Sequence, residues 1–225
     1  MIATGFLGEV PYEVQLLTEA HIPQLEVLQQ EVVEALPDKA ILQPLDEGEL
    51  RNILQGNGLM IGVFAEGSLM AFRALLKPGM DEEHLGLDVG LTTYAQLQQV
   101  LYQEISNVHP QFRGYGLQRT MADIIMQQVD TNEFSVICAT VMPFNIASLK
   151  DKFSQGMHVA ALKYKYGGKL RYVFAKFLNE EIRNFASETE LSMADTEGQQ
   201  KLLKEGYIGI SMRQNESEWF VKYVK

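Results

Sequence analysis

Two glycines stand between the end of an apolar run and the start of a helical pattern near the middle of the chain. The segment reads Val108-His109-Pro110-Gln111-Phe112-Arg113-Gly114-Tyr115-Gly116-Leu117. Glycines let backbone N–H groups turn toward a bound group at close range, and a helix N-terminus adds partial positive charge. A pyrophosphate can therefore be held here without lysines, and the segment predicts a site for a phosphate-bearing cofactor.

The two best-known phosphate loops do not fit this segment. No Gly-Lys-Ser or Gly-Lys-Thr follows the glycines, as a P-loop requires, and Arg119 stands where a dinucleotide fingerprint has its third glycine. Two glycines before a helix are also common in simple turns. An α/β domain whose glycine loop binds nothing therefore stays open as an alternative.

The composition is that of a globular protein that repels polyanions. Of the 225 residues, 46% are hydrophobic and 21% are charged, which is enough to build a sizeable core. Asp and Glu total 29 against 19 Lys and Arg, so a net charge of -10 opposes binding to nucleic acid or to an anionic membrane. Neither is expected as a partner.

Metal and disulfide chemistry are not expected either. The single cysteine, Cys138, cannot form an internal disulfide, and its apolar strand pattern is typical of a small core side chain rather than a nucleophile. The four histidines show no metal-ligand spacing. The segment from Met1 to Pro11 lacks the basic residues of a signal peptide, and no apolar run approaches a membrane span, which predicts a cytoplasmic protein.

The elements that must position the glycine segment can be predicted from hydrophobic periodicity. Before it, the pattern predicts a strand, two helices and a hairpin of two strands: Tyr12–Leu17, a helix from Thr18, Asp46–Leu54, Leu59–Ala65 and Leu69–Leu76. The stretch from Pro78 to Leu97 is glycine-rich and acidic without a clear period, so it is predicted to be a loop or insertion. The segment itself lies between a predicted strand, Leu101 to Val108, and a helix from Leu117.

Strands and helices continue to the end of the sequence. The predicted elements are a buried strand, a short helix, a hairpin, a helix and two strands: Ser135–Val141, Asn145–Gln155, Met157–Tyr166 with Lys169–Phe177, Asp195–Glu205, Tyr207–Met212 and Trp219–Val224. Charge increases from about residue 179. We therefore expect one domain over residues 1–178 and a small appended subdomain over residues 179–225.

Two motifs in this order resemble those of the GNAT superfamily of N-acetyltransferases. Gln111-x-x-Gly114-x-Gly116 after a Val-x-Pro strand end is similar to its acyl-CoA motif, and Pro143-x-Asn145-x-x-Ser148 followed by Gly156 is similar to the next element. The order of elements also matches over roughly residues 12–177. The resemblance implies an α/β (α+β) fold, with a mixed, mostly antiparallel sheet flanked by helices and the small C-terminal α/β appendage.

The resemblance also implies an activity. A GNAT enzyme transfers an acetyl group from acetyl-CoA to a primary amine by direct attack in a ternary complex, and the amine here is an unidentified small molecule or peptide. No metal is implied, and a homodimer is compatible with this interpretation. The alternative, from another class, is a catalytically silent acyl-CoA-binding sensor or interaction module.

Cofactor contacts are carried over residue by residue. Backbone amides of Arg113 through Leu117 would hold the pyrophosphate, with a charged contact from Arg113, while the backbone around Val108 would meet the pantetheine and the thioester carbonyl. Asn145 and Ser148 would lie beside the pantetheine arm. The implied cofactor-binding residues are Val108, Gln111, Phe112, Arg113, Gly114, Tyr115, Gly116, Leu117, Asn145 and Ser148.

The catalytic residues are less completely matched. The superfamily often has a tyrosine seven residues after the motif asparagine, as acid for the leaving thiolate, but here that residue is Lys152. Tyr164, Tyr166 or solvent could replace it, although strand aromatics often only pack. For the base, Glu104 lies on the motif strand, where alternation would place it on the face of Val108.

Alternatives for the base and for the acceptor also stay open. Glu104 could be a surface residue of its strand, and His109 competes as base, although its position favours a role in shaping the turn. Four carboxylates suggest a cationic acceptor such as a polyamine, an aminoglycoside or a peptide amine, while a charge run is also typical of a solvated loop. These carboxylates are Asp81, Glu82, Glu83 and Asp88.

Overall fold

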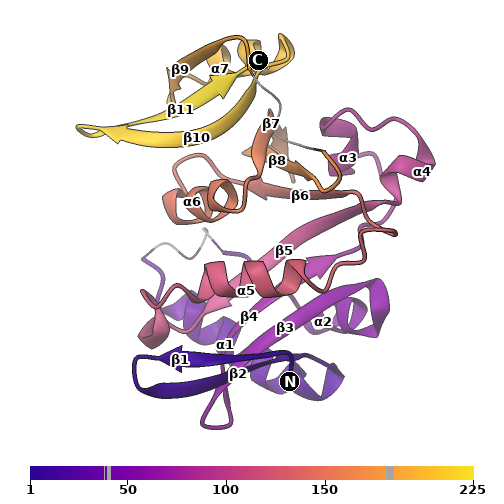
Figure 1. The fold of residues 1–225 in the computed structure, drawn as a ribbon, viewed down its shortest axis with the longest axis vertical. Helices are drawn as coiled ribbons and strands as arrows, with labels where there is room; N and C mark the ends of the chain where they lie inside the picture. The colour runs from indigo at the N-terminus through magenta and orange to yellow at the C-terminus, as the bar shows by residue number, and fades with distance from the viewer. Residues whose placement is uncertain (38, 40–41, 181–184) are drawn as a thin grey trace. The chain divides into compact units, whose positions relative to one another are not determined.

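The computed structural model describes residues 1–37, 39, 42–180 and 185–225. They form two compact units, and the chain leaves the first for the second, returns, and ends in the second (Figure 1). The first unit comprises Met1–Pro78 and Leu101–Val129, and the second comprises Gly79–Val100 and Asp130–Lys225.

The first unit holds strands in the spatial order β1-β2-β3-β4-β5, all paired antiparallel. The strands are β1 (Ala3–Leu7), β2 (Val10–Leu16), β3 (Gly58–Ala65), β4 (Ser68–Leu76) and β5 (Val100–Val108). Glu66 and Gly67 join β3 to β4 with φ of 52° and 79°, the two left-handed residues that a tight hairpin turn requires. The hairpin predicted at this position is confirmed.

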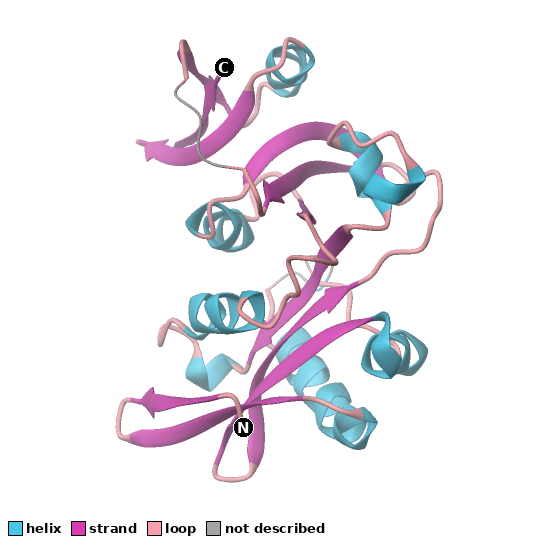
Figure 2. Cartoon of the chain, turned by 45° about the vertical axis from the view of Figure 1, so that its right-hand side comes forward, coloured by secondary structure: helices cyan, strands magenta, loops and turns pink. Residues whose placement is uncertain are grey.

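Helices cover both faces of these strands (Figure 2). Phe72 and Ala74 of β4 belong to one buried cluster with Leu25, whereas Arg73 between them donates from Nη1 to the backbone oxygen of Gln118 at 2.9 Å. Since alternate strand residues point to opposite faces, α1 and α5 lie on opposite sides. The helical segments are η1 (Glu19–His21), α1 (Ile22–Glu34), α2 (Glu47–Asn52), η3 (Ile53–Asn57), η4 (Pro110–Phe112) and α5 (Leu117–Met126).

The second unit holds strands in the spatial order β6-β8-β7-β10-β11-β9, again paired antiparallel. The predicted mostly antiparallel sheet with flanking helices is therefore confirmed. The strands are β6 (Val136–Val141), β7 (His158–Lys165), β8 (Lys169–Phe177), β9 (Glu188–Ser192), β10 (Ile208–Asn215) and β11 (Glu218–Val224). The helices are α3 (Leu85–Asp88), α4 (Tyr94–Leu97), α6 (Ile146–Ser154) and α7 (Thr196–Lys204).

A buried hydrogen-bond network around Gln199 of α7 joins β8 to β11, between which β7 and β10 lie in this sheet. Its Oε1 accepts from the hydroxyl of Tyr172 in β8 at 2.6 Å and from that of Tyr223 in β11 at 2.8 Å. Its Nε2 donates to the backbone oxygens of Met193 and Asp195, both at 3.1 Å. Both tyrosines and Gln199 are fully buried. Satisfied polar networks of this kind fix a single packing arrangement.

The predicted elements are present with small shifts at their ends, and the corrections concern short segments. The stretch predicted as a loop from Pro78 to Leu97 contains α3 and α4, each of four residues and therefore too short to show a helical period. The prediction also missed β1 and β9, each of five residues, two of them exposed. Short edge strands give little alternation to detect.

The division into residues 1–178 and 179–225 stays a prediction. The compact units are divided elsewhere, and Gly209 of β10 pairs with Val159 of β7 within the second unit. Residues 181–184, which the predicted appendage includes, lie outside the described residues. The strands after residue 185 continue the sheet of β7 and β8.

Candidate functional site

The glycine segment forms a turn between β5 and α5. The strand ends at Val108, one turn of 3-10 helix comes next, and α5 begins at Leu117 with Gly116 as its N-cap. Gly114 and Gly116 have φ of 87° and 76°, in the left-handed region that favours glycine. A Cβ added to either residue would meet no heavy atom of the described chain within 4 Å. Both glycines therefore border open space.

Backbone donors gather at this space. Within the described part of the chain, no acceptor bonds the N–H groups of Gly114, Tyr115, Gly116 or Leu117. The first three of these residues are exposed, and the first turn of α5 carries no acidic residue. Free N–H groups at a helix N-terminus attract anions. The turn can therefore hold an anionic group by its backbone alone.

His109 shapes the start of the turn. Its Nδ1 accepts from the backbone N–H of Gln111 at 3.3 Å, and its own backbone N–H donates to the oxygen of Met70 at 2.9 Å. Its Nε2 lies 3.4 Å from Glu31, and its ring lies against that of Phe112 with centroids 5.8 Å apart. These contacts favour the structural role that the sequence suggested for His109.

A bulge interrupts β5 at Glu104. Ala74 pairs with Ile105, but the next residue of β4, Leu75, pairs with Gln103, so Glu104 has no partner across the ladder. A bulge bends a strand and aims the side chain in a new direction. The alternation assumed from the sequence does not hold across this position.

The bulge separates Glu104 from the regular alternation that ends at Val108. Val108 pairs with Ala71, two residues from Arg73, and so shares the face that α5 covers. Repulsion by the carboxylate of Glu49 in α2 acts on Glu104. The placement of Glu104 and Val108 on one face therefore stays a prediction, because alternation cannot be counted through the extra residue of the bulge.

The surroundings of Glu104 suit a proton acceptor. Although the residue is exposed by its surface area, desolvation by neighbouring atoms raises the pKa of its carboxyl, and repulsion by Glu49 raises it further. Glu49 is held in place because its Oε2 accepts from the backbone N–H of Asp46 at 2.8 Å. A carboxyl with a raised pKa binds a proton more readily near neutral pH.

The second motif lies on α6 in the second unit. Asn145 is the N-cap, and its Oδ1 accepts from the backbone N–H of Ser148 at 3.3 Å. Lys152 lies one turn later, buried and paired with Asp151. Asn145, Ser148 and Lys152 have the spacing i, i+3, i+7, which places them along one side of the helix.

The tyrosines considered as acids lie near the tip of the β7–β8 hairpin and are exposed. Tyr164 is 67% exposed and Tyr166 is 47% exposed. The backbone N–H of Tyr166 donates to Glu83 at 3.4 Å. The side chains of Tyr164 and Tyr166 therefore lie largely in solvent.

The acidic stretch predicted as a cationic acceptor site is engaged by its own chain. Asp88 is bonded by Lys163 at 2.6 Å and by Lys165 at 2.7 Å, and both Asp88 and Lys165 side chains are nearly buried. Asp81 accepts from the backbone N–H of Glu83 at 2.9 Å. These contacts favour a structural role for both residues: Asp88 attaches the insertion to β7, and Asp81 stabilises a turn within the insertion.

Other chemistries find little support. Burial raises the pKa of the Cys138 thiol to about 12, so this side chain belongs to the core, as predicted. Among the described residues, no group of three or more His, Cys, Asp or Glu side chains is arranged to hold a metal ion. In the same residues, every helix is too short or too polar to cross a membrane.

The structure thus gathers the predicted residues in two groups. Val108 and the turn from Gln111 to Leu117 belong to the first unit, with Glu104 on the same strand, whereas Asn145, Ser148 and Tyr164 belong to the second. Sequence reasoning missed the bulge, the Glu49–Glu104 pair and the Lys152–Asp151 pair. No sequence signal marks the bulge, since it depends on how β5 pairs with β4.

Known proteins match this chain through structure only. No protein-family model matches the sequence, and no curated protein does. An acetyltransferase of the GNAT family from Listeria monocytogenes has 15% identity and a TM-score of 0.55, over 78% of this chain and 100% of that one. The ribosomal-protein-alanine N-acetyltransferase from Brucella melitensis has 18% identity and a TM-score of 0.54, over 74% and 99%.

The fold is that of the GNAT acetyltransferases. A third match, yncA from Salmonella typhimurium, has 14% identity and a TM-score of 0.56, over 78% of this chain and 99% of that one, and its structure contains its cofactor acetyl-CoA. The resemblance predicted from the two motifs is therefore confirmed for the GNAT fold. The match also extends over nearly the whole of each solved chain.

Proposed function

We propose that this protein is an acetyl-CoA-dependent N-acetyltransferase that acetylates a primary amine of a small molecule or a peptide. The turn from Gly114 to Leu117 carries the proposal. The turn borders open space, its backbone N–H groups have no acceptor in the described chain, and it lies at the N-terminus of α5. The chain has the GNAT fold. An anionic pyrophosphate fits each of these properties.

The residues present fit CoA. Backbone amides from Arg113 to Leu117 would hold the pyrophosphate, and the exposed Arg113 guanidinium would add charge. The proposal assigns Gln111 and Phe112 to the same loop and the backbone of Val108 to the pantetheine amides and thioester carbonyl. Bound acetyl-CoA supplies the activated acetyl group, and no metal takes part in the proposed chemistry.

Glu104 is the proposed general base. An amine acceptor is mostly protonated at neutral pH, and only its neutral form attacks a thioester. A carboxyl with a raised pKa accepts the ammonium proton more readily than an ordinary one, directly or through water. Glu49 adds negative charge there, which favours a cationic acceptor near Glu104.

A silent acyl-CoA sensor is the second candidate, and one observation favours it. Lys152 stands where the resemblance leads us to expect a tyrosine, and the substitute Tyr164 is 67% exposed. A protein of this kind would bind acetyl-CoA without consuming it. Turnover therefore separates the two functions, while binding does not.

Two measurements test the proposal. Saturating acetyl-CoA should raise the thermal midpoint of the purified chain, because a ligand that binds only the folded state stabilises it. Offered amino acids, polyamines, aminoglycosides and peptides, the enzyme should release free CoA thiol with at least one of them. An unchanged midpoint with acetyl-CoA and with CoA would contradict both functions, and binding without thiol release from a broad amine panel would favour the sensor.

A further inference from the structure

Asn107 of β5 carries a buried amide without a hydrogen-bond partner. The residue is 2% exposed, and its Nδ2 has no acceptor among the described residues. Gln29 of α1 is equally buried in the same unit, but its Nε2 donates to the backbone oxygen of Leu45 at 3.0 Å, and its Oε1 accepts from the N–H of that residue at 2.8 Å. A buried donor without a partner destabilises the folded chain. The Asn107 amide is therefore a candidate contact for a ligand.

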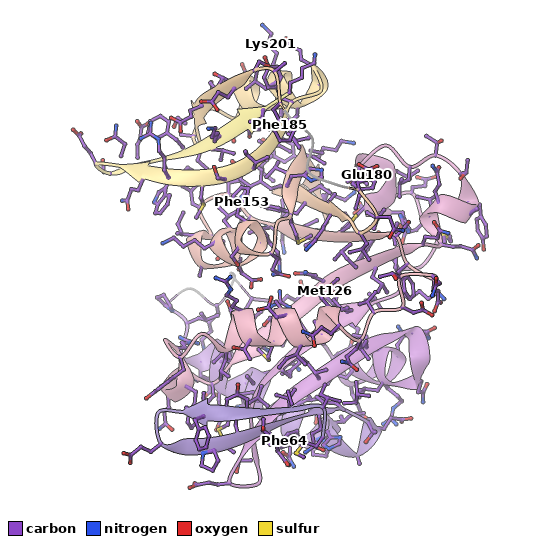
Figure 3. All side chains as sticks on the ribbon, in the orientation of Figure 1. Phe64, Met126, Phe153, Glu180, Phe185 and Lys201 are labelled. Carbon is purple, nitrogen blue, oxygen red and sulfur yellow. The ribbon has the colours of Figure 1, made fainter. Side chains whose placement is uncertain are left out.

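Asn107 lies on the face of β5 that α1 covers. It pairs with Phe72 of β4, in a register that is regular from Ile105 to Val108. Phe72 and Ile105 belong to the buried cluster that includes residues of α1 and Phe64 (Figure 3). Cross-strand partners share a face of the sheet, and so do alternate residues of one strand. The unpaired amide therefore lies on the α1 side of the first unit.

Carboxylates lie at both ends of this part of β5. His109 follows the strand, and its Nε2 lies 3.4 Å from the half-exposed carboxylate of Glu31 in α1. Three residues before Asn107, the carboxyl of Glu104 is repelled by that of Glu49 in α2. Negative charge at both ends favours a cation and disfavours a further carboxylate. An acceptor that binds here should therefore carry an ammonium group, and its oxygen atoms should be neutral.

We propose that Asn107 donates to a neutral oxygen of the amine acceptor, so that the acceptor is a peptide amine or an amino sugar and not a polyamine. This inference rests on the proposed function, which places the amine nitrogen at Glu104. A strand rises about 3.3 Å per residue, so Glu104 and Asn107 lie at most about 10 Å apart, a length that two or three extended peptide residues span. A protonated polyamine has N–H donors and no acceptor, and it would leave the amide unpaired.

The burial of the amide supplies the selectivity. Protein encloses Nδ2, so bulk water does not satisfy it in the free chain. Side-chain rotamers commonly change when a ligand enters a site, which gives a substrate oxygen access to the donor. A site with a buried donor discriminates against any analogue that lacks the matching acceptor, because that analogue leaves the donor unpaired.

The test compares three acceptors on three forms of the full chain. With saturating acetyl-CoA, kcat/KM is measured for a tripeptide amide, an amino sugar and a diaminoalkane of similar length. The forms are the unmodified chain, Asn107→Leu and Ser106→Ala. Ser106 is the matched control, because its buried Oγ also has no partner among the described residues and its side chain lies on the opposite face of β5.

The expected result is a loss that depends on the acceptor. In Asn107→Leu, kcat/KM should fall roughly tenfold to hundredfold for the acceptor whose oxygen is bound, and little for the diaminoalkane. Each acceptor is compared with itself across the three forms, so differences in amine basicity cancel. The peptide and the amino sugar identify the source of the oxygen by which of them loses rate. Ser106→Ala should behave like the unmodified chain with every acceptor.

A second variant keeps the test decisive. Asn107→Leu should fold with an unchanged or higher thermal midpoint, because it removes an unpaired buried donor. Asn107→Ala, with its smaller side chain, takes its place if leucine does not fit. Equal losses for all three acceptors, no loss in a folded variant, or a preference of the unmodified chain for the diaminoalkane would overturn the role of Asn107 alone. Absence of acetyl-CoA binding, or of thiol release with every amine, would overturn the proposed function as well.

Discussion

The glycine turn of the first unit and the Gln199 network of the second treat polar groups in opposite ways. In the turn, the N–H groups from Gly114 to Leu117 have no acceptor in the described chain. Around Gln199, both amide atoms are bonded, and two buried tyrosine hydroxyls are satisfied at 2.6 and 2.8 Å. Backbone N–H groups without an acceptor are available to a ligand, whereas buried polar groups that are hydrogen-bonded to one another stabilise the fold.

Substitutions in the two regions should therefore affect different properties, ligand affinity in the turn and the free energy of unfolding around Gln199. A change at a turn glycine should alter ligand affinity, and its cost in the free energy of unfolding should come from backbone strain at positive φ, because a Cβ there meets no heavy atom within 4 Å. A change in the Gln199 network should do the reverse, because its atoms contact only protein in the described chain. Substitutions in the two regions can therefore separate ligand affinity from stability.

The largest effect is expected at Gly116. Gly116→Val should weaken CoA binding at least about a hundredfold, because its side chain would fill the open space beside the N–H groups, and loss of two charge-assisted hydrogen bonds costs about 3 kcal/mol or more. Isothermal calorimetry with CoA measures the change.

Gly67→Val is the matched control for backbone strain. Gly67 has φ of 79°, close to the 76° of Gly116, and a Cβ there also meets open space. Both variants therefore carry similar strain, but only one lies in the turn. Equal CoA affinity in folded Gly116→Val and Gly67→Val would remove the argument from the turn.

Glu104→Gln should lower turnover on the order of a hundredfold while acetyl-CoA affinity stays nearly constant. Because desolvation raises the pKa of Glu104 above 4.5, kcat/KM of the unmodified chain should rise with pH as this carboxyl loses its proton above that value. The variant lacks this ascending limb. Higher pH should partly rescue it, because hydroxide then deprotonates the amine.

The control for Glu104→Gln is Glu49→Gln. Removing the Glu49 carboxylate removes repulsion, so the pKa of Glu104 should fall and the ascending limb should move to lower pH without disappearing. Near-normal turnover of Glu104→Gln at every pH would make the residue structural. His109 or an ordered water would then be the leading base.

The sequence predicted the site where local rules decide and failed where strand pairing decides. Gly114 and Gly116 are recognisable because a turn into a helix restricts which residues fit, and the apolar period from Leu117 onward identifies the helix itself. The Glu104 bulge depends on how β5 pairs with β4, which periodicity within one strand cannot reveal.

Polar contacts between residues far apart in the sequence could not be predicted from the sequence either. Tyr172, Gln199 and Tyr223 are far apart in the sequence, and nothing in their own segments indicates that they share one buried network. The same is true of Asp88, whose charge is typical of a solvated acidic loop until Lys163 and Lys165 are placed beside it. The fold was predictable from periodicity and motifs, whereas these contacts required the tertiary arrangement.

Gln199→Leu tests the contribution of the Gln199 hydrogen-bond network to stability. Removing the amide leaves two buried tyrosine hydroxyls without their acceptor, so the free energy of unfolding should fall by about 2 kcal/mol or more. Gln200→Leu, the neighbouring control, loses one hydrogen bond to the oxygen of Leu162 and should cost about 1 kcal/mol. Urea denaturation measures both, and CoA affinity of either folded variant should be unchanged. A larger loss in Gln200→Leu would contradict the importance of the network.

The smallest effect is expected from alkylation of Cys138. Burial raises the pKa of this thiol to about 12, so near pH 8 its thiolate fraction should be on the order of a thousandfold below that of an ordinary cysteine. The side chain is also fully buried in β6. Iodoacetamide should therefore leave the native chain unlabelled and its turnover intact, while the urea-unfolded chain takes up one label at its single cysteine. Mass spectrometry counts the labels. Rapid labelling of the native chain with loss of turnover would show that β6 opens readily, and the contrast between an open turn and a closed second unit would no longer hold.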